Sequence, residues 1–262
     1  MKRDEIQTFE DLKEYIFQSK KGTVCHYTSF ESLIMILKNR SIRLSRYDLM
    51  NDYAEKELSK CIDGDLRYII SFAHTKESVA MWALYGKSSS LRLRLEFPIE
   101  DLLSSIDNNF FFDSELNNKI SLYGTKPVSA DYTKKRYTYS SVVYYDKKKH
   151  AFRVEGHPQK NITVTDDMIR SLAGTIKYDA WEYEKESRIA VVLHQDQNIT
   201  NQGEIKYVYA GLNDKFISKL KIRYSPWISE DIQNELTKSI NNLAGFEIKT
   251  QKSDLHGEIS LM

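Results

Sequence analysis

The sequence predicts a mixed α+β fold, on three observations. Strand-like and helix-like segments both occur, but they do not follow the steady β-α-β order of a doubly wound sheet. The 262 residues can build one sizeable core, and no repeat, low-complexity tract or linker divides them. Aromatic residues are plentiful whereas glycine and proline are scarce, which is typical of a packed protein. A single domain over residues 1–262 is therefore expected.

Apolar residues at helical spacing predict the helices, and polar residues before them supply caps. Thr8 is placed to cap a helix at 7–18, which is expected to be an N-terminal appendage. Ser29 is placed to cap a helix at 30–40. Further helices are expected at 76–86, near 99–106, at 163–177 and at 229–243, with a short one following the polar loop after residue 46.

Alternating or continuously apolar runs predict the strands. They lie at 23–29, 41–45, 66–73, 91–97, 140–146, 178–193, 204–211, 219–226 and 245–252. Residues 147–162 are basic and contain glycine and proline, so they are expected to form a loop. The wider stretch 98–162 is predicted to be rich in insertions.

Charge and cysteine content limit the environment. The formal net charge is +1, so no global field favours nucleic acid or an anionic membrane. Cys25 and Cys61 are the two cysteines, too few for a disulfide framework, which suits a reducing cytoplasm. No leader peptide opens the sequence and no apolar run approaches the length of a membrane span. A cytoplasmic protein without membrane contact is predicted.

Several common site motifs are missing. There is no Walker loop, GxGxxG, HExxH, CxxC pair or GxSxG. Cys25 and His26 are adjacent on a predicted strand, where neighbouring side chains point to opposite faces and make poor joint metal ligands. No metal site is predicted.

Four segments, 26–45, 49–55, 71–86 and 181–189, place polar or aromatic residues beside apolar elements. His26 is interpreted either as a ligand contact at a strand edge or as a core histidine. Asn51 lines a pocket or belongs to a turn before a helix. Trp82 and Tyr85, three residues apart on one helical face, are either core or a stacking wall for a flat ring.

The segment WEYEKESR (181–188) has a glutamate at every second position. Read as a strand, it puts Glu182, Glu184, Glu186 and Arg188 on one face. Like charges so close repel unless they are solvated or matched by cations, and a carboxylate held near a ligand would have a perturbed pKa. The alternatives are an exposed strand edge paired with Arg92, Arg94 or lysines, and a functional carboxylate site.

Taken in order, these segments resemble an uncharacterised bacterial family, over roughly residues 23–250. The matching motifs are HYTS (26–29), IRLS (42–45), MND with Glu55, SF (71–72), MWALY (81–85) and WEYEKESR (181–188). Tyr53 and the stretch SSSLRLRLEF depart from the family pattern. The opening motif with a late glutamate also resembles the ADP-ribosyltransferase superfamily, notably its DNA-modifying branch. This resemblance implies a mostly antiparallel, split β-sheet core with flanking helices.

The resemblance implies NAD as substrate and assigns roles to residues. His26 would contact the NAD ribose, Tyr85 or Tyr47 would stack on nicotinamide, and Glu186 or Glu184 would be the catalytic carboxylate. Arg43 or Arg188 would meet the pyrophosphate, and Thr28, Ser45, Asn51 and Trp82 complete the predicted NAD contacts. A carboxylate on the ribose 2′-OH would stabilise an oxocarbenium-like transition state.

The leading function is thus an ADP-ribosyltransferase-like enzyme, in the setting of a toxin or phage-defence effector with an antitoxin or sensor partner. The acceptor is nucleic acid or protein. Nucleic acid would meet the basic stretches at 134–136 and 147–149, which are otherwise solvated lysines. One alternative is a carboxylate- or metal-dependent hydrolase or nuclease that uses Asp52, Glu55 and the glutamates at 182–186. The other is a non-catalytic sensor that binds a nucleotide or peptide.

Overall fold

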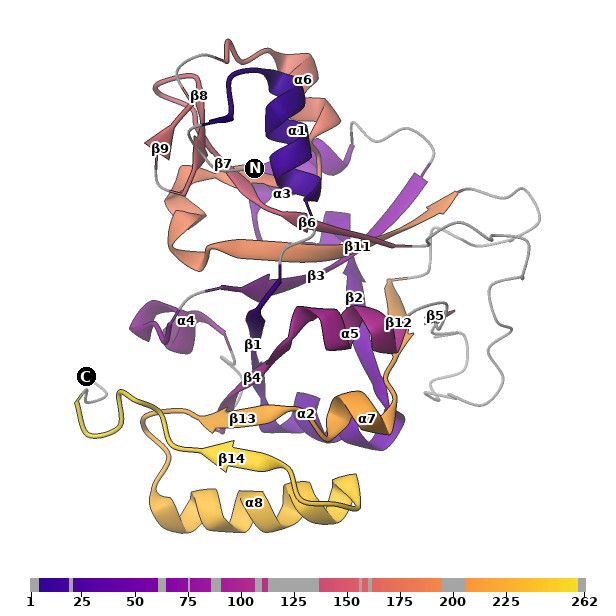
Figure 1. Ribbon diagram of the computed structural model, residues 1–262, viewed down its shortest axis with the longest axis vertical. Coiled ribbons are helices and arrows are strands. Elements are labelled where there is room, and N and C mark those ends of the chain that lie inside the picture. The colour runs from indigo at the N-terminus through magenta and orange to yellow at the C-terminus, as the bar shows by residue number, and fades with distance from the viewer. Residues whose placement is uncertain are drawn as a thin grey trace. The chain divides into compact units, whose positions relative to one another are not determined.

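The structure is a computed structural model, shown in Figure 1. It describes residues 5–18, 21–60, 65–74, 76–85, 91–106, 110–112, 137–155, 157–159, 162–194 and 206–258. The chain divides into two compact units. Unit 1 consists of Met1–Lys20, Arg43–Ser71 and Phe111–Tyr209, and unit 2 consists of Lys21–Ile42, Phe72–Phe110 and Ala210–Met262.

Unit 1 contains the segment WEYEKESR (181–188), which we call the glutamate motif, and most of the strands near it. Its elements are α1 (Phe9–Phe17), η2 (Tyr47–Leu49), α3 (Tyr53–Ser59), β6 (Tyr137–Ser141), β7 (Val143–Asp146), β8 (Ala151–Val154), β9 (His157–Pro158), α6 (Asp166–Ser171), β10 (Ile176–Tyr178), η4 (Asp179–Glu184) and β11 (Glu186–His194). Four of the described strands begin in one unit and end in the other, because the unit boundary falls inside them. They are β2 (Ser41–Arg46), β3 (Asp65–Ala73), β5 (Phe110–Phe112) and β12 (Tyr207–Gly211).

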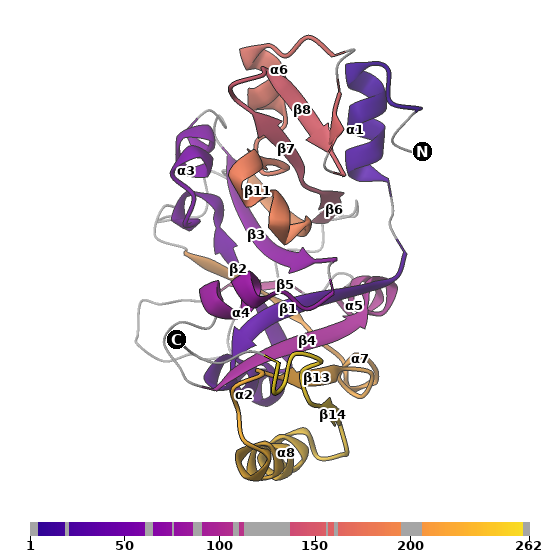
Figure 2. The ribbon, with the colours of Figure 1, turned by 90° about the vertical axis from the view of Figure 1, so that its left-hand side faces the viewer.

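The strands of unit 1 form two groups. In the first, β11 pairs with both β3 and β6, and its pairing with β6 is antiparallel. In the second, β10, β7, β8 and β9 follow one another, with a parallel β10–β7 pair and antiparallel pairs after it. Helices α1 and α6 lie beside β7 and β8 (Figure 2).

Helix α1 belongs to the core of unit 1. Thr8 and Asp11 form a reciprocal capping box at its start, as expected for Thr8. Its buried residues Leu12, Tyr15 and Ile16 pack in one cluster with apolar residues of β7, β8 and α6. The helix therefore contributes a full apolar face to the unit.

Unit 2 combines an antiparallel sheet with several helices. Its elements are β1 (Thr23–Ser29), α2 (Phe30–Asn39), α4 (Val79–Leu84), β4 (Arg92–Pro98), α5 (Ile99–Ile106), α7 (Asp214–Ile217), β13 (Lys221–Tyr224), α8 (Glu230–Ala244) and β14 (Lys249–Gln251). The central pairs β1–β4 and β4–β13 are antiparallel, and β14 adds a parallel edge strand. Ser29 caps α2, as its position in the sequence predicts.

The predicted class, α+β with a mostly antiparallel multi-stranded sheet and flanking helices, is confirmed. Two local predictions are wrong. The stretch 147–162, expected to be a loop, contains β8 and β9 after a basic turn. The helix expected at 163–177 ends at Ser171, and β10 follows, because Gly174 with φ +88° reverses the chain between them. The number of domains stays a prediction.

Some predicted features lie outside the described residues, among them Cys61, position 86 at the expected end of a helix, the basic stretch 134–136 and much of the insertion-rich region. Within the part of the chain that the structure describes, no helix has the length and apolar character needed to cross a membrane.

Candidate functional site

The glutamate motif is not one continuous strand. Residues Asp179–Glu184 form the 3₁₀ helix η4, and Lys185 then adopts a left-handed conformation with φ 44°. Strand β11 begins only at Glu186. The left-handed residue breaks the expected alternation, so that only Glu186 and Arg188 share a strand face. Glu182 turns elsewhere and pairs with Arg153 of β8 at 2.8 Å.

The motif is also not an exposed edge. Arg188 is fully buried, and Glu184 and Glu186 are 2% and 5% exposed. Burial of three ionisable groups is rare unless they are paired, so their partners decide what the motif does.

Arg188 is the centre of the cluster. Its Nε and Nη2 donate to the two carboxylate oxygens of Glu186 at 2.7 and 3.0 Å, a bidentate contact. Its Nη1 lies 2.5 Å from Oε1 of Glu55, on α3, and donates to the carbonyl of Gly174 at 3.0 Å. The Gly174 amide in turn donates to the Tyr47 hydroxyl. A Cβ at position 174 would press on the Arg67 side chain, so a glycine suits this position both in space and in φ.

Lys177 of β10 joins the remaining carboxylates. Its Nζ lies 2.5 Å from Glu184 Oε2 and 3.2 Å from Glu186 Oε2, and it also lies 4.8 Å from the centre of the Trp181 ring. Glu55, Glu184 and Glu186 therefore face Lys177 and Arg188, three carboxylates against two cations. We call these five residues the carboxylate cluster.

The electrostatics of the cluster differ between its members. Burial opposes the charge of Glu186, but the cations Arg188 and Lys177 outweigh it and lower the pKa of Glu186 to about 2. Burial dominates at Glu55 and raises its pKa, despite the attraction of Arg188. Burial also disfavours the charge of Lys177, but Glu186 and Glu184 raise its pKa. Glu186 is thus held ionised, whereas Glu55 takes up a proton more readily than in water.

Hydroxyl groups lie near Glu186 and Arg188. The backbone amide of Glu186 donates to the Tyr144 hydroxyl at 2.9 Å, and Ser71 of β3 helps to lower the pKa of the Glu186 carboxylate. Ser140 lies directly opposite Arg188 in the β6–β11 pair and is 1% exposed. Among the described residues its hydroxyl has no hydrogen-bond partner.

Of the other predicted site residues in unit 1, Tyr47 contacts the carboxylate cluster through Gly174, and Arg43, Ser45 and Asn51 make other contacts or are exposed. Arg43 and Asn51 are exposed, and the Arg43 guanidinium stacks over Tyr207 with 4.5 Å to the ring centre. Ser45 pairs with Ile69 in the β2–β3 ladder. Tyr47 is 1% exposed and reaches the cluster through Gly174, so its ring presents no free face for stacking.

Four predicted residues belong to unit 2. His26 is half-buried, with its ring 6.0 Å from that of Phe72 in an edge contact, and Thr28 is buried. Trp82 is fully buried and meets the Tyr27 ring edge-on at 4.8 Å. Tyr85 is partly buried and packs against the same cluster of apolar residues. Thr28 and Trp82 are therefore core residues of β1 and α4, whereas His26 and Tyr85 are only partly buried.

Sequence reasoning missed Lys177, Gly174 and Ser140. It considered Glu55 as part of a family motif and as a metal ligand or acid–base group, but not as a partner of Arg188. No local motif marks the first three, because each reaches the cluster from a different element. Only the register of β11 with its neighbours and the turn at Gly174 bring them together.

Within the described residues, no group of three histidine, cysteine, aspartate or glutamate side chains is arranged to hold a metal ion. The carboxylates of the cluster face Arg188 and Lys177, which compete with any cation for the same oxygens.

Comparison with known proteins gives one match. The family model described as "Protein of unknown function (DUF2971)" matches residues 81–189, which is less than half of the chain. No curated protein and no solved structure matches. The matched segment includes the predicted MWALY motif and ends just after WEYEKESR, so it contains Glu184, Glu186 and Arg188 but neither His26 nor Glu55.

Proposed function

We propose that the protein is an NAD-consuming ADP-ribosyltransferase-like enzyme whose catalytic carboxylate is Glu186. The observation that carries this proposal is the charge of the carboxylate cluster. It combines an excess of carboxylates over cations with deep burial, and Arg188 and Lys177 keep Glu186 ionised. A negative charge shielded from water stabilises a nearby developing cation far better than an exposed one does.

The chemistry fits this charge. Cleavage breaks the bond between C1′ of the ribose and the nicotinamide nitrogen, and nicotinamide leaves with the electron pair. The ribose then carries positive charge, which Glu186 stabilises through the 2′-OH. A lone pair of the acceptor forms the new bond to C1′, and the acceptor's proton passes to Glu184 or to solvent. Arg188 orients Glu186 through its bidentate contact.

The remaining assignments follow from the resemblance. His26 and Thr28 would hold the ribose, and Arg43, Ser45, Asn51, Trp82 and Tyr85 would serve NAD binding. Nucleic acid or protein would be the acceptor, in a cytoplasmic toxin or defence system. The exposed turn of Lys147, Lys148, Lys149 and His150 between β7 and β8 supports nucleic acid, because four consecutive exposed cationic or titratable side chains can contact phosphates.

The test is release of nicotinamide from NAD by the purified chain, with and without nucleic acid or cell lysate. We expect Glu186→Gln to lower the rate by two or more orders of magnitude, because an amide cannot supply the charge. Glu182→Gln is the matched control, since it lies in the same motif but pairs with Arg153 outside the cluster. It should retain most of the activity.

Loss of folding has to be separated from loss of chemistry. Glu186→Gln should still bind NAD and show a cooperative unfolding transition, since the amide oxygen can accept one of the Arg188 bonds. His26→Ala, assayed beside it, tests the ribose contact. Absence of turnover in the wild-type chain under every condition would reject the proposal, as would a Glu186→Gln variant as active as Glu182→Gln.

A further inference from the structure

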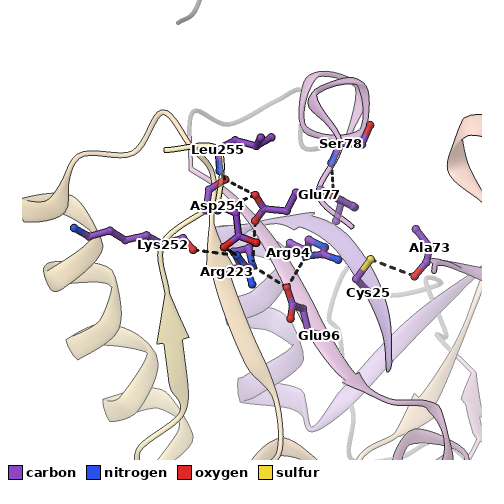
Figure 3. A network of polar contacts seen from close by, with 12 residues as sticks. Cys25, Ala73, Glu77, Ser78, Arg94, Glu96, Arg223, Lys252, Asp254 and Leu255 are labelled. Atoms are coloured by element: carbon purple, nitrogen blue, oxygen red, sulfur yellow. Dashed lines mark hydrogen bonds and ion pairs between the residues drawn. The ribbon is translucent and has the colours of Figure 1, made fainter. Parts of the chain in front are cut away.

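A second charged cluster lies in unit 2 and holds the last described residues of the chain (Figure 3). Arg223 of β13 lies 3.0 Å from Glu77 Oε1 and 2.9 Å from Glu96 Oε1. Arg94 pairs with the same Glu96 oxygen at 2.5 Å. We call Glu77, Arg94, Glu96 and Arg223 the arginine clasp. It connects β4, β13 and the chain just before α4.

The residues after β14 attach to this clasp, and we call residues 253–258 the C-terminal strap. Glu77 Oε2 accepts the Ser253 hydroxyl at 2.5 Å and the Asp254 amide at 3.0 Å. Asp254 Oδ1 lies 2.6 Å from Nη1 of Arg223. Further along, the His256 ring lies 3.0 Å from the carbonyl of Pro226. The strap is thus held by polar contacts on either side of Leu255.

Between those contacts, Leu255 packs against an aromatic cluster. The buried members of this cluster include Tyr27, Met81 and Trp82, and the partly buried rings of Tyr85 and Trp227 pack against the same group. Two of these residues, Trp82 and Tyr85, are the ones expected to stack on a flat ring. The apolar anchor of the strap therefore packs on the same aromatic cluster to which these two rings belong.

We propose that the C-terminal strap is an autoinhibitory lid, which competes with a planar ring for the aromatic cluster. This proposal rests on the proposed function, because the planar ring is the nicotinamide of NAD. Opening is inexpensive, because the strap has one apolar anchor and its ionic contact is through Asp254, whose side chain is 79% exposed. After opening, Glu77 still faces Arg223, and Glu96 still faces Arg94 and Arg223. No buried charge is left without a partner.

Amide hydrogen exchange measures the opening directly. The amide of Asp254 donates to Glu77, outside the strap, so its exchange reports release of the strap. The amides of Leu255 and His256 donate to the Ser253 hydroxyl and carbonyl, within the strap, so their exchange reports its internal order. We expect these three amides to exchange faster than the amides of β13. Asp254→Ala should accelerate them a further two- to fivefold, roughly the effect of losing one exposed ion pair. Glu258→Ala, which removes the same charge from the same strap, should not.

Competition predicts a specific kinetic change. If NAD binds only the open form, the apparent affinity scales with the open fraction. Asp254→Ala and Leu255→Ala should then lower the KM for NAD by the same factor as the exchange rates rise, with kcat unchanged. Leu255→Ala removes the apolar anchor of the strap. If this variant does not fold, Asp254→Ala remains as the test.

The outcomes separate the two proposals. Strap amides that exchange no faster than those of β13, or that respond equally to Asp254→Ala and Glu258→Ala, overturn the lid. Turnover of NAD with a KM that does not follow the open fraction overturns the competition while the proposed function stands. Absence of turnover in every variant rejects the proposed function, and the lid is then judged by exchange and by NAD titration of the tryptophan fluorescence in Asp254→Ala.

Discussion

The two charged clusters use similar residues but differ in how they depend on their partners. In the carboxylate cluster of unit 1, the Arg188 guanidinium is the shared partner of Glu55 and Glu186, and it is fully buried. Glu186 has Lys177 as a second cation, but the ion pair of Glu55 is with Arg188. In the arginine clasp of unit 2, Glu96 pairs with both Arg94 and Arg223, Glu77 also accepts from Ser253, and one end of the network reaches the solvent at Asp254. The first arrangement fixes a charge in place, whereas the second tolerates the departure of a segment.

The largest expected effect comes from removing the shared cation. Arg188→Met should destabilise the fold by about 3–5 kcal/mol, because it leaves the buried Glu55 without its ion-pair partner and Glu186 with Lys177 alone. Arg223→Met should cost only about 1–3 kcal/mol, since Glu96 keeps Arg94 and Glu77 keeps Ser253 and the Asp254 amide. Urea unfolding of both variants measures the difference. Equal losses would show that the two clusters do not differ in redundancy.

The next effect is expected in acid. The pKa of Glu186 is lowered from 4.5 to about 2, so between those values the unfolded chain binds more protons than the folded one. The contribution of Glu186 is therefore complete above about pH 4.5 and is lost as the pH falls towards 2. Glu55 has the opposite sign, because its raised pKa makes the folded chain bind the extra proton.

Urea unfolding between pH 2 and 7 tests this assignment. In Glu186→Gln the loss of stability on acidification should be shallower than in the wild type, and in Glu55→Gln it should be steeper. Glu182→Gln, outside the cluster, should follow the wild-type curve. A Glu186→Gln curve parallel to the wild type would contradict the pairing with Arg188 and Lys177.

Most of the fold could be predicted because its signals are local. Strand β1 has the predicted bounds, and the caps at Thr8 and Ser29 start the helices where side-chain oxygens meet the first free amides. The errors lie where one residue redirects the chain. Gly174 ends a segment that looks helical, and Lys185 takes a left-handed conformation that periodicity does not reveal.

The candidate site was only partly predictable, for a related reason. WEYEKESR drew attention to Glu184, Glu186 and Arg188, because closely spaced like charges need an explanation. What explains them is Lys177 on β10 and Glu55 on α3, whose positions depend on tertiary pairing rather than on spacing along the chain. The burial of Trp82 and Tyr47 likewise depends on the elements that cover them.

The smallest effect sharpens the contrast between the clusters. Asp254→Ala should lower the free energy of unfolding by only about 0.2–1 kcal/mol, since its carboxylate is mostly solvated even when paired with Arg223. Because the Asp254 carboxylate is exposed, 1 M NaCl should abolish the difference from the wild type, whereas the loss in Arg188→Met should persist at the same salt concentration. Urea titrations at low and high salt measure both. A salt-resistant loss in Asp254→Ala would mean that the strap is built into the fold as firmly as Arg188 is, and a strap held that firmly could not serve as a lid.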